Sequence, residues 1–181
     1  MRDGPGRTPL PITFLGLTIA TTIYAGFETE VLPKADFHTV GWLVLAIPVP
    51  LQLVPAVWGW IRGELAAATA SSVLGVTWLG LALATIAGTV GAPGPSKAES
   101  LLVFASAAAL VVSVATELVD GSLVTAAVLV VAAGRFTLTG VSGITHAQSW
   151  TTTAGVAGFV LAGVALTGAF VVELRSALSR R

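Results

Sequence analysis

The sequence contains no cysteine among its 181 residues, and it contains few charged side chains. Without cysteine the chain cannot form a disulfide, a thiolate zinc site, an iron–sulfur cluster or a cysteine nucleophile. Asp, Glu, Lys and Arg make up 10% of the sequence, whereas a soluble domain carries about 25%. A soluble fold of this composition would expose large apolar areas to water, so a soluble globular enzyme is excluded.

A strong charge of one sign is also missing. Nine basic residues balance nine acidic ones, and the formal net charge is +0. Nucleic acid is therefore excluded as a partner, because no basic field attracts it. The two histidines, His38 and His146, belong to no Ser/His/Asp set or HExxH motif, and the sequence has no glycine-rich phosphate loop. We therefore expect no enzyme activity, no cofactor and no metal.

Hydrophobic residues, in contrast, make up 55% of the chain, and its mean hydropathy is +0.90. A membrane span needs about 20 mostly apolar residues. Six stretches fit this requirement, over residues 12–27, 38–61, 65–90, 101–119, 122–141 and 153–172. The separators, beginning with the charged segment 28–36, are short and have the composition of turns. We therefore expect an all-α membrane protein: one transmembrane domain over residues 1–181, built as a bundle of six transmembrane helices.

Basic residues predict how these spans are oriented. An even number of spans places both ends of the chain on one side, and we expect the first stretch to stay as a span rather than serve as a signal peptide. That side collects Arg2, Arg7, Arg62, Arg175, Arg180 and Arg181. The opposite loops hold only Lys34 and Lys97. The positive-inside rule therefore predicts that both termini are cytoplasmic, in a plasma (cytoplasmic) membrane.

Polar residues within the spans are the first functional candidates, because they are costly in hydrocarbon. Arg135 lies in the fifth span, where an arginine costs roughly 2.5–3.5 kcal/mol at the bilayer centre. Three interpretations of its side chain are open: it reaches the outer headgroups, it pairs within the bundle, or it places a positive charge beside an anion path. Gln52 lies in the second span among Pro48, Pro50 and Pro55, which predict a kink or local unwinding. Its amide either hydrogen-bonds the backbone groups that the kink leaves without partners, or lines a pore.

Hydroxyl groups gather on the first and third spans. Thr13, Leu17 and Thr21 share one helix face at a spacing of four, and Leu74 and Trp78 share a face of the third span. Two such faces could line a narrow pore with a hydrophobic gate. The alternative is that each hydroxyl only bonds the backbone of its own helix.

Two segments resemble a known family. Residues 8–16, TPLPITFLG, resemble the N-P-A-P-L-G-L signature that opens the first helix of the acetate uptake transporter (succinate-acetate permease) family. A second segment keeps the order and spacing of that family's longer motif at Gln52, Gly63, Thr69, Ala70, Gly75 and Trp78. The chain departs from the family residues at Thr8, Gly59 and Glu64.

The resemblance implies a six-helix protomer with its own pore, and a ring of six such protomers. Family members move acetate, and in some cases succinate, either as a channel or together with protons. They narrow the pore with a phenylalanine on the first helix, a tyrosine on the third and a leucine on the fifth. The residues aligned with the first two are Leu17 and Leu74, so the resemblance implies an aliphatic gate.

We therefore expect a transporter or channel for acetate or a similar small carboxylate, with proton coupling left open. The backbone N–H groups at the proline-flanked start of the first helix, hydroxyl groups and an amide would offer hydrogen bonds to the anion. The expected path residues are Pro9, Pro11, Thr13, Leu17, Thr21, Gln52, Thr69, Ser71, Leu74, Trp78 and Arg135. Two alternatives remain: a channel for a small neutral solute such as urea or an amide, and a structural membrane protein that carries no flux.

Overall fold

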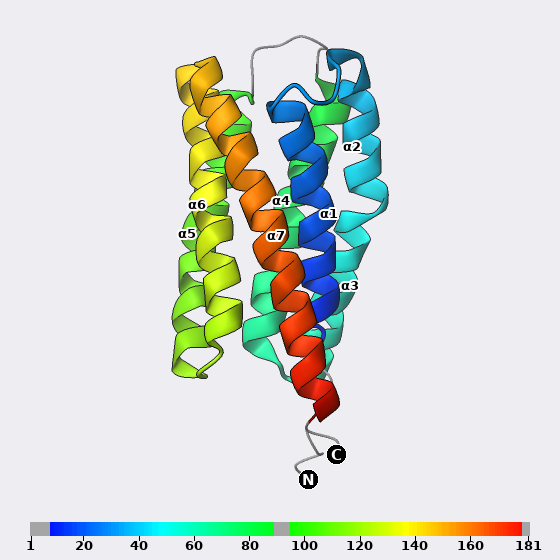
Figure 1. The fold of residues 1–181 in the computed structure, drawn as a ribbon, viewed down its shortest axis with the longest axis vertical. Helices are drawn as coiled ribbons and strands as arrows, with labels where there is room; N and C mark the ends of the chain where they lie inside the picture. Colours follow the sequence, from blue (N-terminus) through cyan, green and yellow to red (C-terminus); the bar gives the residue numbers. More distant parts are fainter. Residues whose placement is uncertain (1–7, 89–94, 179–181) are drawn as a thin grey trace.

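The computed structural model of the protein describes residues 8–88 and 95–178, and every regular element in these ranges is a helix (Figure 1). The elements in chain order are α1 (Leu10–Glu28), the short 3-10 helix η1 (Lys34–Asp36), α2 (Phe37–Ala46), α3 (Pro48–Arg62), α4 (Leu65–Ala87), α5 (Lys97–Val119), α6 (Leu123–Thr145) and α7 (Gln148–Leu178). Within the described ranges, six helical segments are long and apolar enough to cross a membrane, with Lys34–Arg62 forming the second. The predicted six-helix bundle is confirmed.

The helices run alternately up and down the bundle, so α1 begins at the end where α7 finishes (Figure 1).

Several helices are longer than the predicted spans. The clearest is α7, which runs over Gln148–Leu178 rather than 153–172, because polar residues of its first and last turns stay helical outside the apolar stretch. The third span ends at Ala87, and its predicted residues 89 and 90 lie outside the described ranges. Four of the arginines used for orientation, Arg2, Arg7, Arg180 and Arg181, also lie outside them, so the cytoplasmic termini remain a prediction.

The second span is broken, as its prolines predict. Helix α2 ends at Ala46 and α3 begins at Pro48, with Ile47 between them at φ −116° and ψ −69°. Proline has no N–H group to continue the hydrogen-bond ladder and clashes with the preceding turn. Pro55 is accommodated inside α3. The break therefore occupies a single residue rather than the whole segment 48–55.

Small residues let the helices approach closely. Ala154, Gly158 and Ala162 on α7 recur every four residues and are all buried. A Cβ atom added at Gly158 would lie 3.0 Å from Cβ of Ala25 on α1. Such contacts associate helices in lipid, where no hydrophobic force acts between them.

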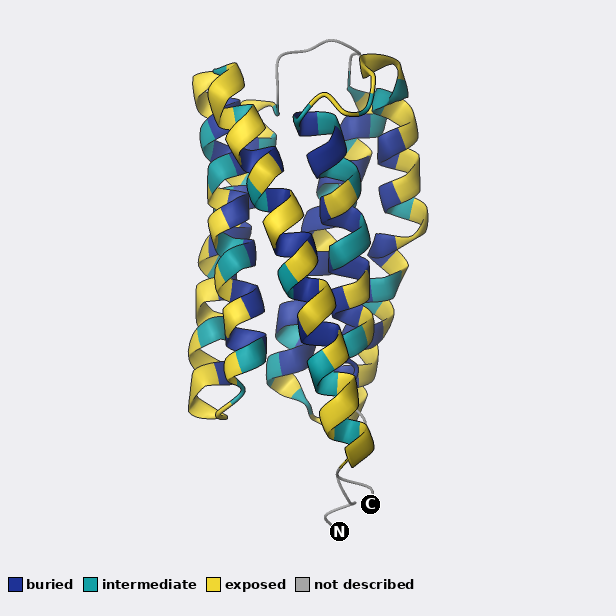
Figure 2. Ribbon diagram, in the orientation of Figure 1, coloured by how far each residue is buried: buried dark blue, intermediate teal, exposed yellow. Residues whose placement is uncertain are grey.

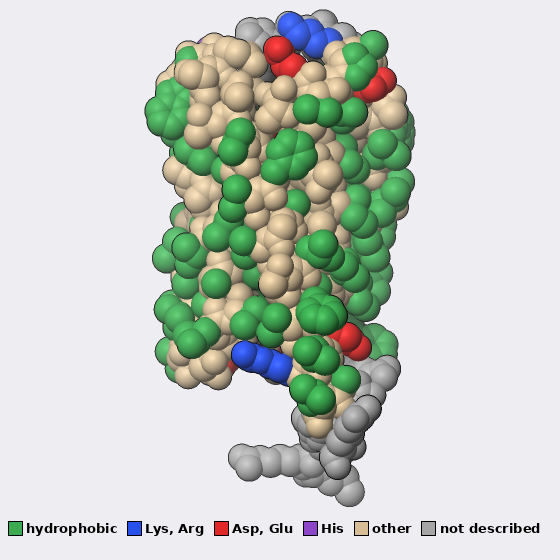
Figure 3. Space-filling view, viewed as in Figure 1, with side chains coloured by type: hydrophobic (Ala, Val, Ile, Leu, Met, Phe, Trp, Pro, Cys, Tyr) green, Lys and Arg blue, Asp and Glu red, His purple; other side chains and the backbone are tan. Residues whose placement is uncertain are grey.

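The outer surface of the bundle is apolar. Figure 2 shows buried residues along the inward faces of the helices and exposed residues along their outward faces. The exposed residues include many large hydrophobic side chains, among them Val57, Leu101 and Phe170. On the face seen in Figure 3, charged side chains gather near the two ends and leave the middle free of them. This distribution fits a multi-pass membrane protein whose central band faces lipid.

We predict that Gly41→Ala destabilises the bundle. A Cβ atom at Gly41 on α2 would lie 2.8 Å from Ile86 Cγ1 and 3.0 Å from the Ala82 carbonyl oxygen on α4. Because part of this contact is backbone, overpacking should cost about 1–3 kcal/mol and lower the melting temperature in detergent. Gly134→Ala is the matched control, since a Cβ atom there has nothing within 4 Å. Equal melting temperatures for both variants would contradict the packing of α2 on α4.

Candidate functional site along the bundle axis

The first contact of the site joins α1 to α4. Thr13 Oγ1 and Ser71 Oγ are 2.7 Å apart in a hydrogen bond, and both residues are fully buried. One turn farther along these helices lie Leu17 and Leu74, which belong to one buried apolar cluster and have no exposed surface. The predicted hydroxyl and leucine faces of the two helices are therefore buried in the bundle, at neighbouring levels.

Gln52 of α3 lies between two glycines of the neighbouring helices. A Cβ atom at Gly16 of α1 would be 3.1 Å from Gln52 Cγ, and one at Gly75 of α4 would be 3.3 Å from Gln52 Cβ. The Gln52 side chain is fully buried, and neither of its amide atoms has a hydrogen-bond partner within the described residues. The interpretation in which this amide satisfies the proline break is therefore wrong.

An aromatic cluster lies farther along α4. The buried Trp78 ring is 5.3 Å from the Tyr24 ring of α1 and 5.6 Å from the Phe136 ring of α6, measured between centroids. Trp78 Nε1 also has no hydrogen-bond partner in the described part of the chain. The sequence pattern singled out Trp78 only, because Tyr24 lies outside the motif of the first span and Phe136 lies on a span without a motif. The candidate site thus contains an aromatic layer in addition to the two leucines.

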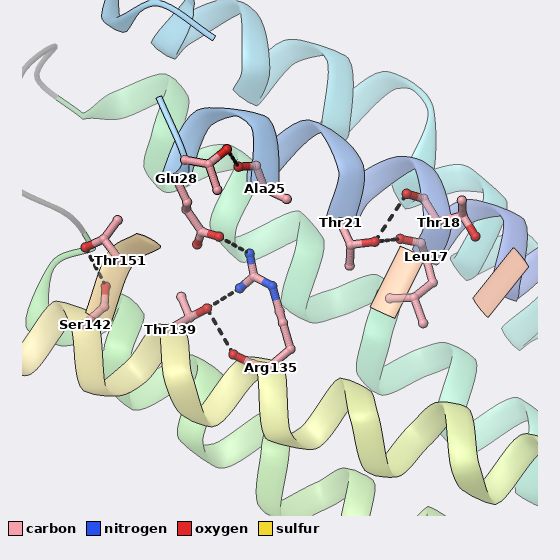
Figure 4. A network of polar contacts seen from close by, with 10 residues as sticks. Leu17, Thr18, Thr21, Ala25, Glu28, Arg135, Thr139, Ser142 and Thr151 are labelled. Atoms are coloured by element: carbon pink, nitrogen blue, oxygen red, sulfur yellow. Dashed lines mark hydrogen bonds and ion pairs between the residues drawn. The ribbon is translucent and has the colours of Figure 1, made fainter. Parts of the chain in front are cut away.

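A buried ion pair lies beyond the aromatic cluster (Figure 4). Arg135 Nη2 of α6 is 2.8 Å from Glu28 Oε2 of α1, and Arg135 Nη1 donates a hydrogen bond to Thr139 Oγ1. The Arg135 Cζ atom lies 5.8 Å from the Trp78 ring centroid, within cation–π range. Arg135 is 1% exposed, so it pairs within the bundle and does not reach the headgroups.

Glu28 was missed by the sequence analysis, which placed it in a charged connection over residues 28–36. It is instead the last residue of α1 and is 8% exposed. A signal for it existed, since an arginine inside a span requires a carboxylate partner. Glu28 directly follows the apolar run of the first span. This end of the first span and the end of the fifth span nearer to Arg135 are predicted to lie on the same side of the membrane, opposite the termini.

Thr21 and Thr69 are the remaining predicted hydroxyls of the site. Thr21 is buried, but its hydroxyl donates to the Leu17 carbonyl oxygen of its own helix at 2.7 Å (Figure 4). Thr69 is only half-buried. The backbone interpretation of membrane threonines therefore holds for Thr21.

The proline-flanked start of α1 also offers little to an anion. Pro9 is the N-cap residue, and its carbonyl oxygen accepts the N–H groups of Ile12 and Thr13 at 3.1 and 3.4 Å. Pro11 has no N–H group and is half-buried. These first-turn donors already have acceptors, so the structure leaves Pro9 and Pro11 without the predicted role as a cradle of free N–H groups.

Comparison with known proteins identifies the fold. No protein-family profile matches this chain, and its sequence matches none of the curated proteins. The solved structure of the bacterial acetate channel SatP superposes with a TM-score of 0.78 at 15% sequence identity, covering 95% of this chain and 94% of that chain. The protein has the fold of that channel. The six-helix fold of the protomer implied by the family resemblance is thereby confirmed over nearly the whole chain.

The site is a column of buried groups with different chemistry along its length. From Thr13 to Glu28, fifteen residues of α1 span about 22 Å at 1.5 Å per residue. A hydroxyl pair lies at one end and an ion pair at the other, with aliphatic and aromatic side chains between them. The unpartnered amide of Gln52 and indole N–H of Trp78 lie in this middle section. The unpartnered groups have the donor chemistry to hydrogen-bond an oxygen-bearing solute.

We predict that Arg135→Met destabilises the protein by about 3–5 kcal/mol, because it leaves the Glu28 carboxylate buried without its partner. Adding Glu28→Leu should restore most of the loss, since an apolar pair often replaces a buried ion pair without cost. Melting temperatures of the wild type, both single variants and the double variant in detergent measure this cycle. A double variant no more stable than Arg135→Met would show that the ion pair itself holds the bundle together.

Proposed function

We propose that the protein is a membrane transporter or channel for acetate or a similar small carboxylate. The observation that carries the proposal is the set of unpartnered polar atoms along the buried column: the Gln52 amide, Trp78 Nε1 and Arg135 Nε. An unsatisfied buried polar group costs about 1–3 kcal/mol. Three such groups on one column are expected where a passing ligand completes their hydrogen bonds.

The likeness to the acetate channel SatP supports this proposal, because the two chains share one fold over almost their full lengths. The sequence segments that resemble the acetate uptake transporter family lie on α1, α3 and α4. These helices carry Thr13, Leu17, Gln52, Ser71, Leu74 and Trp78, most of the residues of the column. The resemblance and the unpartnered polar atoms therefore point to one region of the molecule.

The chemistry of the column fits a short carboxylate. A bare anion in hydrocarbon is prohibitive, so its oxygens need donors on the way, and the guanidinium of Arg135 supplies a positive charge. The constriction at Leu17 and Leu74 favours a solute with a methyl group, or its protonated acid, over a hydrated inorganic ion. Both leucines are fully buried, as a closed constriction requires.

We extend the proposal to the assembly and its location. Each protomer would hold its own path, and copies of the chain would associate through their exposed apolar faces in the plasma membrane, with both termini cytoplasmic. The resemblance favours a ring of six. The mass of the protein in native detergent micelles tests the number of copies, and protease access to tagged ends in oriented vesicles tests the orientation.

Uptake of labelled acetate into proteoliposomes tests the function directly. We expect acetate flux that responds to an imposed membrane potential or to external pH, because a carboxylate moves as a charge or together with a proton. Urea is the comparison solute, whose flux does not depend on potential. Urea flux alone would support a neutral-solute channel, and no flux of either solute through a folded oligomer would support a structural role.

The constriction gives a specific prediction. Leu17→Trp and Leu74→Trp should each reduce acetate flux at least about tenfold, because an indole fills the narrow level of the path. Leu83→Trp on α4 is the matched control, since Leu83 is 50% exposed on the outer face of the same helix as Leu74. Unchanged flux in both constriction variants, with normal assembly, would show that the path lies elsewhere.

A further inference from the structure

The guanidinium of Arg135 is only partly occupied. Its Nη2 contacts Glu28 and its Nη1 contacts Thr139, but its Nε has no partner within the described residues. Helix α7 presents Gly158, which has no side chain, to this edge: a Cβ atom there would lie 3.5 Å from Nε. Arginine can bind two carboxylate oxygens at once through neighbouring N–H groups. The free edge of Arg135 therefore has the donor chemistry that a second carboxylate needs.

Stability does not explain this ion pair. Burying two charges costs about as much as their attraction returns, so an apolar pair of similar size often serves a core equally well. The position of the pair is more informative. The Arg135 side chain has no exposed surface, whereas 9% of the Glu28 side chain is exposed. Glu28 therefore lies between the guanidinium and the solvent at that end of the column.

The carboxylate of Glu28 and that of a small carboxylic acid are the same chemical group. A solute that replaces Glu28 on Arg135 leaves the guanidinium paired throughout, so no buried cation is exposed without a partner. With Glu28 in place, the arginine and glutamate have a combined formal charge of zero. An arriving anion is therefore held only as long as Glu28 does not return.

We propose that Glu28 is an internal competitor for an anion subsite on Arg135. The transported carboxylate binds first at the Nε edge, beside Trp78, and then takes the Nη2 position as Glu28 leaves it. The return of Glu28 releases the solute toward the end of the column at which α1 finishes. This inference rests on the proposed function and adds to it the residue that sets affinity and release.

The decisive variant is Glu28→Gln, which removes the competing charge and keeps the size of the side chain. The site then carries a net positive charge, so we expect the KM for acetate uptake to fall at least about tenfold, as for close charge pairs in other sites. The maximal rate should fall as well, because release slows. Glu30→Gln is the matched control: Glu30 is exposed two residues farther along the chain, and its loss should leave both values unchanged.

Two further variants keep the test decisive if Glu28→Gln folds poorly. Glu28→Asp keeps the charge and withdraws the carboxylate by one methylene, so KM should fall to a value between those of the wild type and Glu28→Gln. The double variant Glu28→Gln, Arg135→Gln is neutral and removes the subsite, so acetate should no longer raise its melting temperature in detergent. That melting readout needs no flux and reports binding alone.

The outcomes separate this inference from the proposed function. A wild type that neither binds nor moves acetate overturns the proposed function, and this inference with it. A wild type that moves acetate, together with folded Glu28 variants of unchanged KM, overturns only the inference. An equal loss of rate in every variant without a change in KM assigns the pair a purely structural role and also overturns it.

Discussion

Hydrocarbon provides no hydrogen-bond partner, so every polar group in a membrane span must find one inside the protein. Many hydroxyls in the described ranges do so within their own helix, as Thr77 and Thr85 do by donating to the carbonyl oxygen four residues earlier. Gln52, Trp78 and Arg135 differ, because each has a buried polar atom without a hydrogen-bond partner and all three lie along one column. Ser113 on α5 also has an unpartnered hydroxyl, but it lies outside this column. The fold thus gathers these three unsatisfied groups along one column.

The sequence predicted the fold better than the site. Hydrophobic length predicted six helices because the thickness of the bilayer sets the length of a span, and the prolines predicted the break in the second one. Spacing and motif placed Thr13, Ser71 and Gln52 in the candidate site. The ion pair could not be predicted in the same way, because Glu28 and Arg135 are 107 residues apart and Glu28 follows an apolar run at the point where a polar turn is expected.

The candidate site contains two apolar layers, whereas the family resemblance pointed to the aliphatic one only. The leucines Leu17 and Leu74 form one layer, and the rings of Tyr24, Trp78 and Phe136 form the other, about ten ångströms farther along α1 at 1.5 Å per residue. The Tyr24 hydroxyl oxygen and Thr85 Oγ1 are 2.7 Å apart in a hydrogen bond, which fixes one ring of the second layer. On the proposed path a solute would cross two apolar levels, with the indole N–H of Trp78 in the second of them.

The break at Ile47 separates two parts of one span. Helix α2 packs on α4 toward one end of the bundle, and α3 carries Gln52 between α1 and α4 toward the other. Pro48 and Pro50 have no N–H group, so the ladder between the two helices is already incomplete. The broken span is thus a joint between two helices of different direction, and this change of direction places the Gln52 amide between α1 and α4.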